Sequence, residues 1–344
     1  TYAGSLRRFR ETVGDIDLMG TAADPQKVMD AFVSLPLVGQ VLVQGPTKSS
    51  VVIAGGLQVD LRMVEHEAFG SLLQYFTGSK QHNIALRERG RRQGLKLSEY
   101  GITDVATDKL EKFAEEVKFY RRLGLQFIPP ELREDQGEVE KAEQGAIPAL
   151  VELADIKGDL HIHSDWSDGQ NSIEEMALAA KERGYQYIAI TDHSGGRGIA
   201  HGLDAERLER QIDEVRKVNE RLEGIRVLSG SEVDIRVDGK LDLPHEVLSR
   251  LDIVIAAVHS SMNQSEEKMT ARVLSAVENP DVDIIAHPTC RLLGEREPVA
   301  IDLEAVLRAA AKQNKIVEIN AMPKRLDLND VHASRAREIG VKLT

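Results

Sequence analysis

The chain of 344 residues has little cysteine and no long apolar run. Cys290 is its only cysteine, so no disulfide can form within the chain, and a reducing compartment is expected. No apolar run approaches the ~20 residues that a membrane helix needs, and no signal-peptide pattern opens the sequence. These absences predict a cytoplasmic protein without a membrane partner. The length suffices for two or three domains with cores of their own.

The chain also lacks an overall excess of positive charge, since its formal net charge is −12. That average hides an asymmetry, because residues 1–130 carry 17 basic and 15 acidic side chains and the remainder 27 and 41. One basic cluster is opposed only by Glu88 and consists of Lys80, Arg87, Arg89, Arg91, Arg92 and Lys96. A solvated helix face explains such a cluster, and contact with a phosphate backbone is the alternative. The acidic remainder suits a site that collects divalent cations.

The sequence suggests that the chain is truncated at both ends. The sequence begins with TYAGSLRR, without an initiator methionine, and stops at GVKLT, a β-like run. We therefore expect a fragment of a longer protein.

Three aspartates in strand-like segments are candidates for a two-metal site. Asp15 and Asp17 are separated by one residue, so in a strand both carboxylates lie on one side. Asp60 lies in the alternating segment LQVDLRMV and is followed by Arg62. Such carboxylates can hold two divalent metals that activate a hydroxyl group and stabilise a leaving pyrophosphate. Taken alone, the pattern is more typical of strand-edge acids that face water.

Two further segments carry groups suited to phosphates. The segment GSLRR, residues 4–8, offers backbone amides, a hydroxyl and guanidinium groups in a small turn. The segment TGS, residues 77–79, forms a turn that opens a helix, and Asn83 and Arg87 share one face of that helix.

The order of GSLRR, GDID, VDLR and YFTGSKQHNIALR, followed by EYGI, resembles the palm and thumb of a family X DNA polymerase over residues 4–102. The resemblance implies that Asp15, Asp17 and Asp60 are the catalytic carboxylates, with Mg²⁺ or Mn²⁺ as the ion. Arg62 would hold a catalytic aspartate between its ligand-free and ligand-bound states. Such polymerases carry a lyase-like domain and a fingers domain ahead of the palm, and neither is present here.

The same resemblance implies contacts with nucleotide and DNA. Ser5 and Arg8 would bind the incoming triphosphate, with Gly14 beside them. A turn that senses the sugar would follow, Asn83 would touch the base or minor groove, and Arg87 the template. The full set of implied nucleotide and DNA contacts is Gly4, Ser5, Arg8, Gly14, Arg62, Tyr75, Phe76, Gly78, Ser79, Asn83 and Arg87.

Histidine and acidic side chains stand where the apolar strands of the second part are predicted to end. His161 and His163 point to one side of a strand, and Asp168 follows five residues later. The other predicted strand ends carry Asp192-His193, Glu232, His259 and His287. Reactive groups of an α/β barrel gather at these ends, and imidazole and carboxylate are the ligands of Zn, Mn or Fe sites. One strand-end histidine is more typical of a core residue, but together these residues indicate a metal site.

Other histidines and one arginine have weaker context. We expect surface or structural roles for His66, His82, His245 and His332. His201 is a candidate to border the metal site, and Arg291 a candidate to bind phosphate, although a surface arginine at a helix start is equally plausible.

The motifs HIHSDWSDG, TDHS, GSEVDI, VHSS and AHPT resemble the PHP family in their order, over residues 158–344. The resemblance implies a distorted (β/α)7 barrel with up to three ions of Mn²⁺, Zn²⁺ or Fe²⁺, and Glu232 as a bridge between two of them. The ligands carried over by match are His161, His163, Asp168, His193, Glu232, His259 and His287. The last ligand-bearing strand of such a barrel, with an Asp-x-His motif, is expected shortly after Thr344, which would leave an open edge.

Together the resemblances predict an α/β and α+β multidomain fold. A truncated nucleotidyltransferase palm would span residues 1–66, and a small thumb residues 67–130, with one or two helices over residues 103–128. Pro129-Pro130 stops helix formation, and residues 131–153 read as an acidic linker with a short helix. A strand–helix alternation over residues 154–344 predicts parallel β/α units, here a PHP barrel without its last strand region.

The two parts suggest a DNA repair polymerase for short gaps, coupled to a metal-dependent phosphodiesterase. The expected partners are dNTPs and gapped or 3′-recessed DNA, without an obligatory protein partner. The phosphodiesterase would act as a 3′→5′ exonuclease or process abasic and blocked 3′ ends in base excision repair. One alternative is a barrel that only braces the polymerase as a metal-stabilised scaffold. Another is a small-molecule phosphatase of the histidinol-phosphate kind, which the polymerase motifs disfavour.

Overall fold

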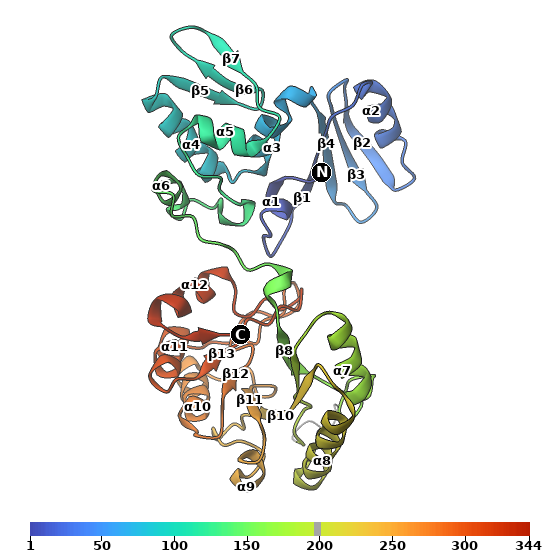
Figure 1. Cartoon of the computed structure of the whole chain (residues 1–344), viewed down its shortest axis with the longest axis vertical. Helices are drawn as coiled ribbons and strands as arrows, with labels where there is room; N and C mark the ends of the chain where they lie inside the picture. The colour runs from blue at the N-terminus through green and yellow to red at the C-terminus, as the bar shows by residue number, and fades with distance from the viewer. Residues whose placement is uncertain (196–200) are drawn as a thin grey trace. The chain divides into compact units, whose positions relative to one another are not determined.

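The structure is a computed structural model that describes residues 1–195 and 201–344 (Figure 1). It divides into two compact units, Thr1–Leu150 and Val151–Thr344. The division falls within residues 131–153, the range that the sequence suggests as a linker. Among the described residues, no helix combines the length and apolar character that crossing a membrane requires.

A four-stranded sheet forms the first part of unit 1, with the strand order β1-β4-β3-β2. Its strands are β1 (Asp15–Gly20), β2 (Val38–Gln44), β3 (Lys48–Ile53) and β4 (Gln58–Met63). β1 runs parallel to β4, whereas β2, β3 and β4 are antiparallel neighbours. The parallel register pairs Asp17 with Asp60, which places two of the predicted catalytic carboxylates on adjacent strands.

Two helices lie close to this sheet in the sequence, and the second packs against it. The short α1 (Gly4–Arg7) precedes β1. α2 (Pro25–Val33) begins at Asp24, whose carboxylate accepts a hydrogen bond from the Lys27 N–H group and so caps the helix. Met29 and Phe32 of α2 belong to one apolar cluster with side chains of the sheet.

The second part of unit 1 combines helices with a three-stranded antiparallel sheet, β5-β6-β7. Its strands are β5 (Leu95–Ser98), β6 (Gly101–Asp104) and β7 (Lys109–Glu111). Its helices are α3 (Phe69–Thr77), α4 (Lys80–Arg92), α5 (Glu116–Arg122) and α6 (Glu138–Glu143), with 3-10 turns at His66–Ala68 and Pro130–Leu132. A core that includes Leu86, Phe119 and Tyr120 joins α4, α5 and α6 to β5 and β6.

The prediction of one or two helices over residues 103–128 is wrong in its first part. Residues 103–111 instead complete β6, turn and form β7, and only α5 is helical. The reason is local, because the Asp104 carboxylate accepts hydrogen bonds from the N–H groups of Ala106 and Thr107. Such side-chain contacts stabilise a turn in competition with a helix.

Unit 2 contains a seven-stranded parallel sheet with the order β14-β13-β12-β11-β10-β9-β8 (Figure 1). The strands are β8 (Gly158–Ile162), β9 (Tyr187–Ile190), β10 (Arg226–Asp234), β11 (Ile253–Ala257), β12 (Ile284–Ile285), β13 (Ile316–Val317) and β14 (Lys342–Leu343). The helices are α7 (Ile173–Glu182), α8 (Ala205–Arg221), α9 (His245–Leu248), α10 (Glu266–Glu278), α11 (Leu303–Lys312) and α12 (Asp330–Ile339), after a 3-10 turn at Leu153–Asp155. Because the strands alternate with helices and the sheet curls, unit 2 fits a partial β/α barrel.

The central strands of unit 2, β9 to β12, are largely buried, so they read as apolar runs rather than alternating ones. All five residues of β11 are buried, and β10 is buried over most of its length. Parallel strands end at one edge of the sheet, so the residues that follow β8 to β13 meet there. The mixed α/β and α+β multidomain architecture predicted from the sequence is confirmed.

Candidate metal centre and nucleotide cavity

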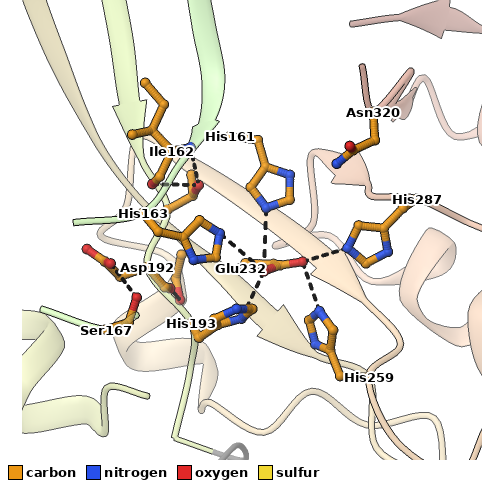
Figure 2. Close-up of polar contacts among 12 residues, drawn as sticks. His161, Ile162, His163, Ser167, Asp192, His193, Glu232, His259, His287 and Asn320 are labelled. Atoms are coloured by element: carbon orange, nitrogen blue, oxygen red, sulfur yellow. Dashed lines mark hydrogen bonds and ion pairs between the residues drawn. The ribbon is translucent and has the colours of Figure 1, made fainter. Parts of the chain in front are cut away.

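Glu232 is the centre of the site in unit 2 (Figure 2). It lies near the end of β10, and only 2% of the residue is exposed. Its two carboxylate oxygens lie 2.9–3.4 Å from imidazole nitrogens of five histidines, which are His161, His163, His193, His259 and His287. All five were predicted as ligands from the sequence, and the structure brings them together around the predicted bridging carboxylate.

Four different strands supply these histidines. His161 lies in β8 and His163 follows it, and their rings stack with centroids 5.3 Å apart, as expected for side chains on one side of a strand. His193 follows β9 and forms a backbone bridge with Glu232. His259 and His287 follow β11 and β12. The cluster therefore depends on the parallel order of the sheet.

The electrostatics of the cluster favour a cation. Burial alone would raise the pKa of the Glu232 carboxyl, but hydrogen bonds from the histidines hold it well below its usual range. Burial would lower the pKa of His161, whereas its hydrogen bonds to Glu232 and Glu318 raise it to about 10. The pKa of His163 is lowered, chiefly because the ring is buried. An ionised carboxylate among nitrogen donors is the environment that a divalent metal requires.

The donor set fits a centre for more than one ion. Three overlapping groups have donor atoms that lie within 4.8 Å of one another: His161 with His163 and Glu232; His163 with Asp168 and His193; and His193 with Glu232 and His259. In addition, Nδ1 of His287 is buried without a hydrogen-bond partner among the described residues. Imidazole and carboxylate are the ligands that Zn, Mn and Fe use, so these residues fit a polynuclear metal centre.

Asp168 closes the cluster on its more exposed side. One of its oxygens lies 2.9 Å from Nδ1 of His163, and the other lies 3.5 Å from Nε2 of His193. Burial would raise the pKa of this carboxyl, but the two imidazoles lower it. The loop that carries Asp168 is held by Asp192, which accepts hydrogen bonds from Ser164 and from Ser167 at 2.5 Å.

Two carboxylates that contact the cluster were missed from the sequence. Oδ1 of Asp234 lies 2.7 Å from Nδ1 of His259, and Oε1 of Glu318 lies 2.5 Å from Nδ1 of His161. In both pairs the other ring nitrogen, Nε2, faces Glu232. A signal existed for each, because Asp234 is two residues after Glu232 on one strand and Glu318 directly follows β13.

The weaker candidates lie in other settings. His201 is exposed, and it directly follows residues 196–200, which are outside the described part of the chain. Arg291 donates from Nε to the Arg325 carbonyl at 2.9 Å and from Nη2 to the Leu326 carbonyl, so these two atoms bind backbone. His82 is fully buried and bonded to Glu138, which fits the structural role expected for it.

In unit 1, the three predicted catalytic carboxylates influence one another. Burial raises the pKa of Asp17, and the charges of Asp15 and Asp60 raise it further. Asp60 accepts a hydrogen bond from Gln58 at 2.8 Å and lies 3.8 Å from Nζ of Lys48. A divalent cation would relieve such repulsion between neighbouring carboxylates, and oxygen ligands suit Mg²⁺ or Mn²⁺.

Asp15 and Asp17, but not Asp60, line a cavity of about 410 Å³. Besides these two aspartates, its lining combines most of the residues predicted to bind nucleotide with Lys80, which was noted only as a member of the basic cluster. The full lining is Gly4, Ser5, Arg8, Asp15, Asp17, Tyr75, Phe76, Gly78, Lys80, Asn83 and Arg87. The close packing is visible at Gly4, where a Cβ atom would lie 2.6 Å from Oδ2 of Asp17. Segments 4–8, 15–17 and 75–87 thus form one site.

The remaining predicted residues do not line this cavity. Arg62 stacks its guanidinium over the Phe76 ring, 4.2 Å from the ring centroid. Ser79 caps α4 by accepting the His82 N–H group, and Gly14 is exposed. Asn83, in contrast, is one of the lining residues, and its amide donates to the Tyr75 carbonyl at 2.7 Å.

The basic cluster on and after α4 divides into two parts. Arg89 is structural, because it donates to the Leu123 carbonyl and pairs with Glu143 at 2.8 Å. The other members are exposed: Lys80, Arg87, Arg91, Arg92 and Lys96. They leave a basic surface available to an anionic polymer.

Both units match known protein families. The model of the DNA polymerase beta thumb matches residues 72–134, and that of the PHP domain residues 159–322. The chain is 46% identical over 343 residues to a Bacillus subtilis (strain 168) protein described as "DNA polymerase/3′-5′ exonuclease PolX". That match covers 99% of this chain and 60% of the B. subtilis protein, so the chain spans less than two thirds of this relative.

Unit 2 also resembles shorter proteins. A "Probable phosphatase" of Thermoanaerobacter sp. (strain X514) is 35% identical over 198 residues, which cover 54% of this chain and 75% of that protein. A "Probable phosphatase" of Caldanaerobacter subterraneus subsp. tengcongensis is 32% identical over 201 residues, with 54% and 72% covered. Both resemblances noted in the sequence are confirmed. The chain belongs to the family X DNA polymerases that carry a PHP domain.

Proposed function

We propose that this chain contributes the palm, thumb and nuclease of a DNA repair polymerase that fills short gaps and trims 3′ ends. The observation that carries the nuclease is the convergence of five histidines on the buried Glu232. The polymerase proposal is supported by the pairing of Asp17 with Asp60 beside a cavity that Arg8 also lines. The B. subtilis relative, whose name gives both activities, supports the combination.

In unit 1, Asp15, Asp17 and Asp60 would hold Mg²⁺ or Mn²⁺. Bound there, the ions would activate the 3′ hydroxyl of a primer and stabilise the leaving pyrophosphate. Ser5 and Arg8 line the cavity next to these carboxylates and are placed to bind the triphosphate of a dNTP. The exposed basic residues of α4 would contact the DNA backbone and position the template and primer.

In unit 2, Glu232, Asp168 and the five histidines would hold up to three ions of Mn²⁺, Zn²⁺ or Fe²⁺. Ions at this site would lower the pKa of bound water and neutralise charge on the scissile phosphate. Asp234 and Glu318 fix the ring orientations of His259 and His161 through their Nδ1 atoms. The expected substrate is gapped or 3′-recessed DNA, cut from its 3′ end or at abasic and blocked 3′ ends.

Two alternatives differ in what unit 2 does. A scaffold that only braces the polymerase would have no need of so many inward-facing ligands, whereas seven predicted ligands meet here. A small-molecule phosphatase is favoured by the names of the shorter relatives. The polymerase motifs of unit 1 favour DNA over a small phosphate ester.

The test uses a full-length version of the protein, Mn²⁺ and 3′-labelled DNA, with the variants Glu232→Ala and Asp60→Ala. Loss of 3′ degradation in Glu232→Ala alone, and of nucleotide insertion in Asp60→Ala alone, is the expected result. The exposed Glu182→Ala serves as a control for removal of a carboxylate in unit 2. Absence of degradation by the wild type, or equal degradation by Glu232→Ala, overturns the nuclease. Cleavage of histidinol phosphate but not of DNA would support the phosphatase instead.

A further inference from the structure

Arg133 and Glu134 lie in the range that the sequence suggests as a linker, yet both are bound to residues around the nucleotide cavity. Glu134 contacts Arg8, which lines the cavity, and Arg133 contacts Glu116 and the backbone of Ser79. Arg133 is fully buried, although arginine is among the residues least often buried. The side chain of Glu134 is 21% exposed and points to Arg8. A passive linker would leave both side chains in solvent, so their contacts require another explanation.

Glu134 holds one edge of the Arg8 guanidinium. Nε of Arg8 donates to Oε1 of Glu134 at 2.8 Å, and Nη1 of Arg8 donates to the Thr77 carbonyl at 2.6 Å. Nε of Arg10 lies 3.9 Å from the same glutamate oxygen. A guanidinium is a rigid plane with five N–H donors, so contacts at two of its three nitrogens determine the direction of the third. The Arg8 side chain also lines the cavity.

Arg133 forms hydrogen bonds with Glu116 of α5 and with the backbone of Ser79. Its Nη1 donates to Glu116 at 2.7 Å, and Glu116 in turn accepts two hydrogen bonds from Arg7 at 3.0 and 2.6 Å. The Arg133 carbonyl accepts the N–H group of Ser79 at 3.0 Å. Residues 133–134 are therefore bound both to α1, which carries Ser5 and Arg7, and to the turn at residues 77–79.

We propose that Glu134 is a positioning residue for nucleotide binding, which holds Arg8 against the turn at Thr77 so that the Nη2 edge of Arg8 serves the phosphates of a dNTP. The proposal rests on the proposed function, in which Arg8 binds the triphosphate. Among the described residues, Nη2 of Arg8 forms no hydrogen bond. Nη2 also does not belong to the buried polar atoms that lack a partner. An arginine fixed in this way loses less freedom when an anion binds.

The opposite effect would follow if Glu134 competed with the triphosphate for Arg8. A competing carboxylate would be expected to face the cavity and to occupy the outer edge of the guanidinium. Glu134 is not among the residues that line the cavity, and it contacts Nε. If Glu134 positions Arg8, removing its carboxylate weakens dNTP binding. If Glu134 competes with the triphosphate, removing its carboxylate strengthens dNTP binding.

The experiment measures the affinity of the Mg²⁺ complex of dATP by calorimetry, and KM and kcat for gap filling, in a full-length version of the protein. Glu134→Gln removes the charge but keeps an acceptor oxygen, and Glu134→Ala removes both. Glu131→Gln is the matched control, because Glu131 is exposed in the same segment. Arg8→Ala reports on the proposed nucleotide site itself. The melting temperature of each variant shows whether it is folded.

The expected result is a rise in Kd and KM of about tenfold in Glu134→Ala, with a smaller rise in Glu134→Gln and kcat near that of the wild type. Glu131→Gln should bind like the wild type. If Arg8→Ala binds dATP as well as the wild type, the proposed role of Arg8 is wrong. If Arg8→Ala loses binding while Glu134→Gln and Glu134→Ala bind equally well or more tightly than the wild type, the positioning role of Glu134 is overturned.

Discussion

Nδ1 of His161 in β8 lies 2.5 Å from Oε1 of Glu318, the residue that follows β13. The contact joins an edge strand of the barrel sheet to the strand beside the opposite edge. The second oxygen of Glu318 accepts the backbone N–H group of His287 at 2.7 Å. Because Glu318 engages Nδ1, the Nε2 atom of His161 faces Glu232. One carboxylate thus sets the position of two predicted metal ligands.

Replacement of Glu318 by alanine should weaken metal binding by about 10–100-fold, the usual effect of losing a partner that orients a ligand. The affinity for Mn²⁺ can be measured by titration calorimetry of protein freed from metal. Glu318→Gln retains an acceptor oxygen and should lose less affinity. Equal affinity in Glu318→Ala and the wild type would show that His161 needs no orientation by Glu318.

Removal of metal should destabilise unit 2 and leave unit 1 unchanged. An ion that binds only the folded state at 100 times its Kd stabilises it by about 2.7 kcal/mol. The single tryptophan, Trp166, lies in unit 2, so its fluorescence reports the melting of that unit. A chelator should lower this melting temperature, and Mn²⁺ should restore it. In Glu232→Ala the response to Mn²⁺ should be reduced, and an unchanged response would argue against a metal centre at Glu232.

Substitution of Gly4 by alanine should impair nucleotide insertion by tenfold or more while 3′ degradation persists. Gly4 has a φ of +63°, which alanine rarely adopts, and the added Cβ atom would lie 2.6 Å from Oδ2 of Asp17. Gly39→Ala is the control, because its Cβ atom would meet the Val52 carbonyl oxygen at 3.5 Å, an ordinary contact. Gap-filling and exonuclease assays on one preparation separate the effects. Normal insertion by Gly4→Ala would show that the carboxylate tolerates displacement.

His82 should make the stability of unit 1 depend on pH. Its ring is fully buried, with Nδ1 2.6 Å from Glu138 and Nε2 2.8 Å from the Tyr120 hydroxyl. Burial lowers the pKa of His82, so the unfolded chain binds a proton more readily than the folded one. The stabilisation is therefore present above pH ~6.5 and is lost as the pH falls below it.

The pH effect can be followed by hydrogen exchange of the α4 amides between pH 5.5 and 7.5, after correction for intrinsic exchange rates. Protection in the wild type should decrease toward pH 5.5. His82→Asn should be less stable at pH 7.5 but lack this added pH dependence. A wild-type protection that rises as the pH falls would contradict the assignment. The pKa of Glu138 is lowered, in spite of its burial, by the bond to His82, so this carboxylate remains ionised in the window used.

The alternation of side chains along a strand made part of each site predictable from the sequence. His161 and His163 share one side because side chains alternate along a strand, and this property needs no tertiary information. The same holds for Asp15 and Asp17. Residues 103–111 were mispredicted as helical because a single hydrogen-bonding side chain, Asp104, stabilises a turn there.

The sequence by itself determined which residue types end each strand, and hence that imidazoles and carboxylates gather at one edge of a parallel sheet. Only the tertiary structure decided the pairs: Glu318 with His161 across 157 positions, and Glu134 with Arg8 across 126. Spacing along a strand or helix sets the direction of a side chain within its own element. Which distant carboxylate it meets depends on how the sheet curls and the helices pack, and those are properties of the whole fold.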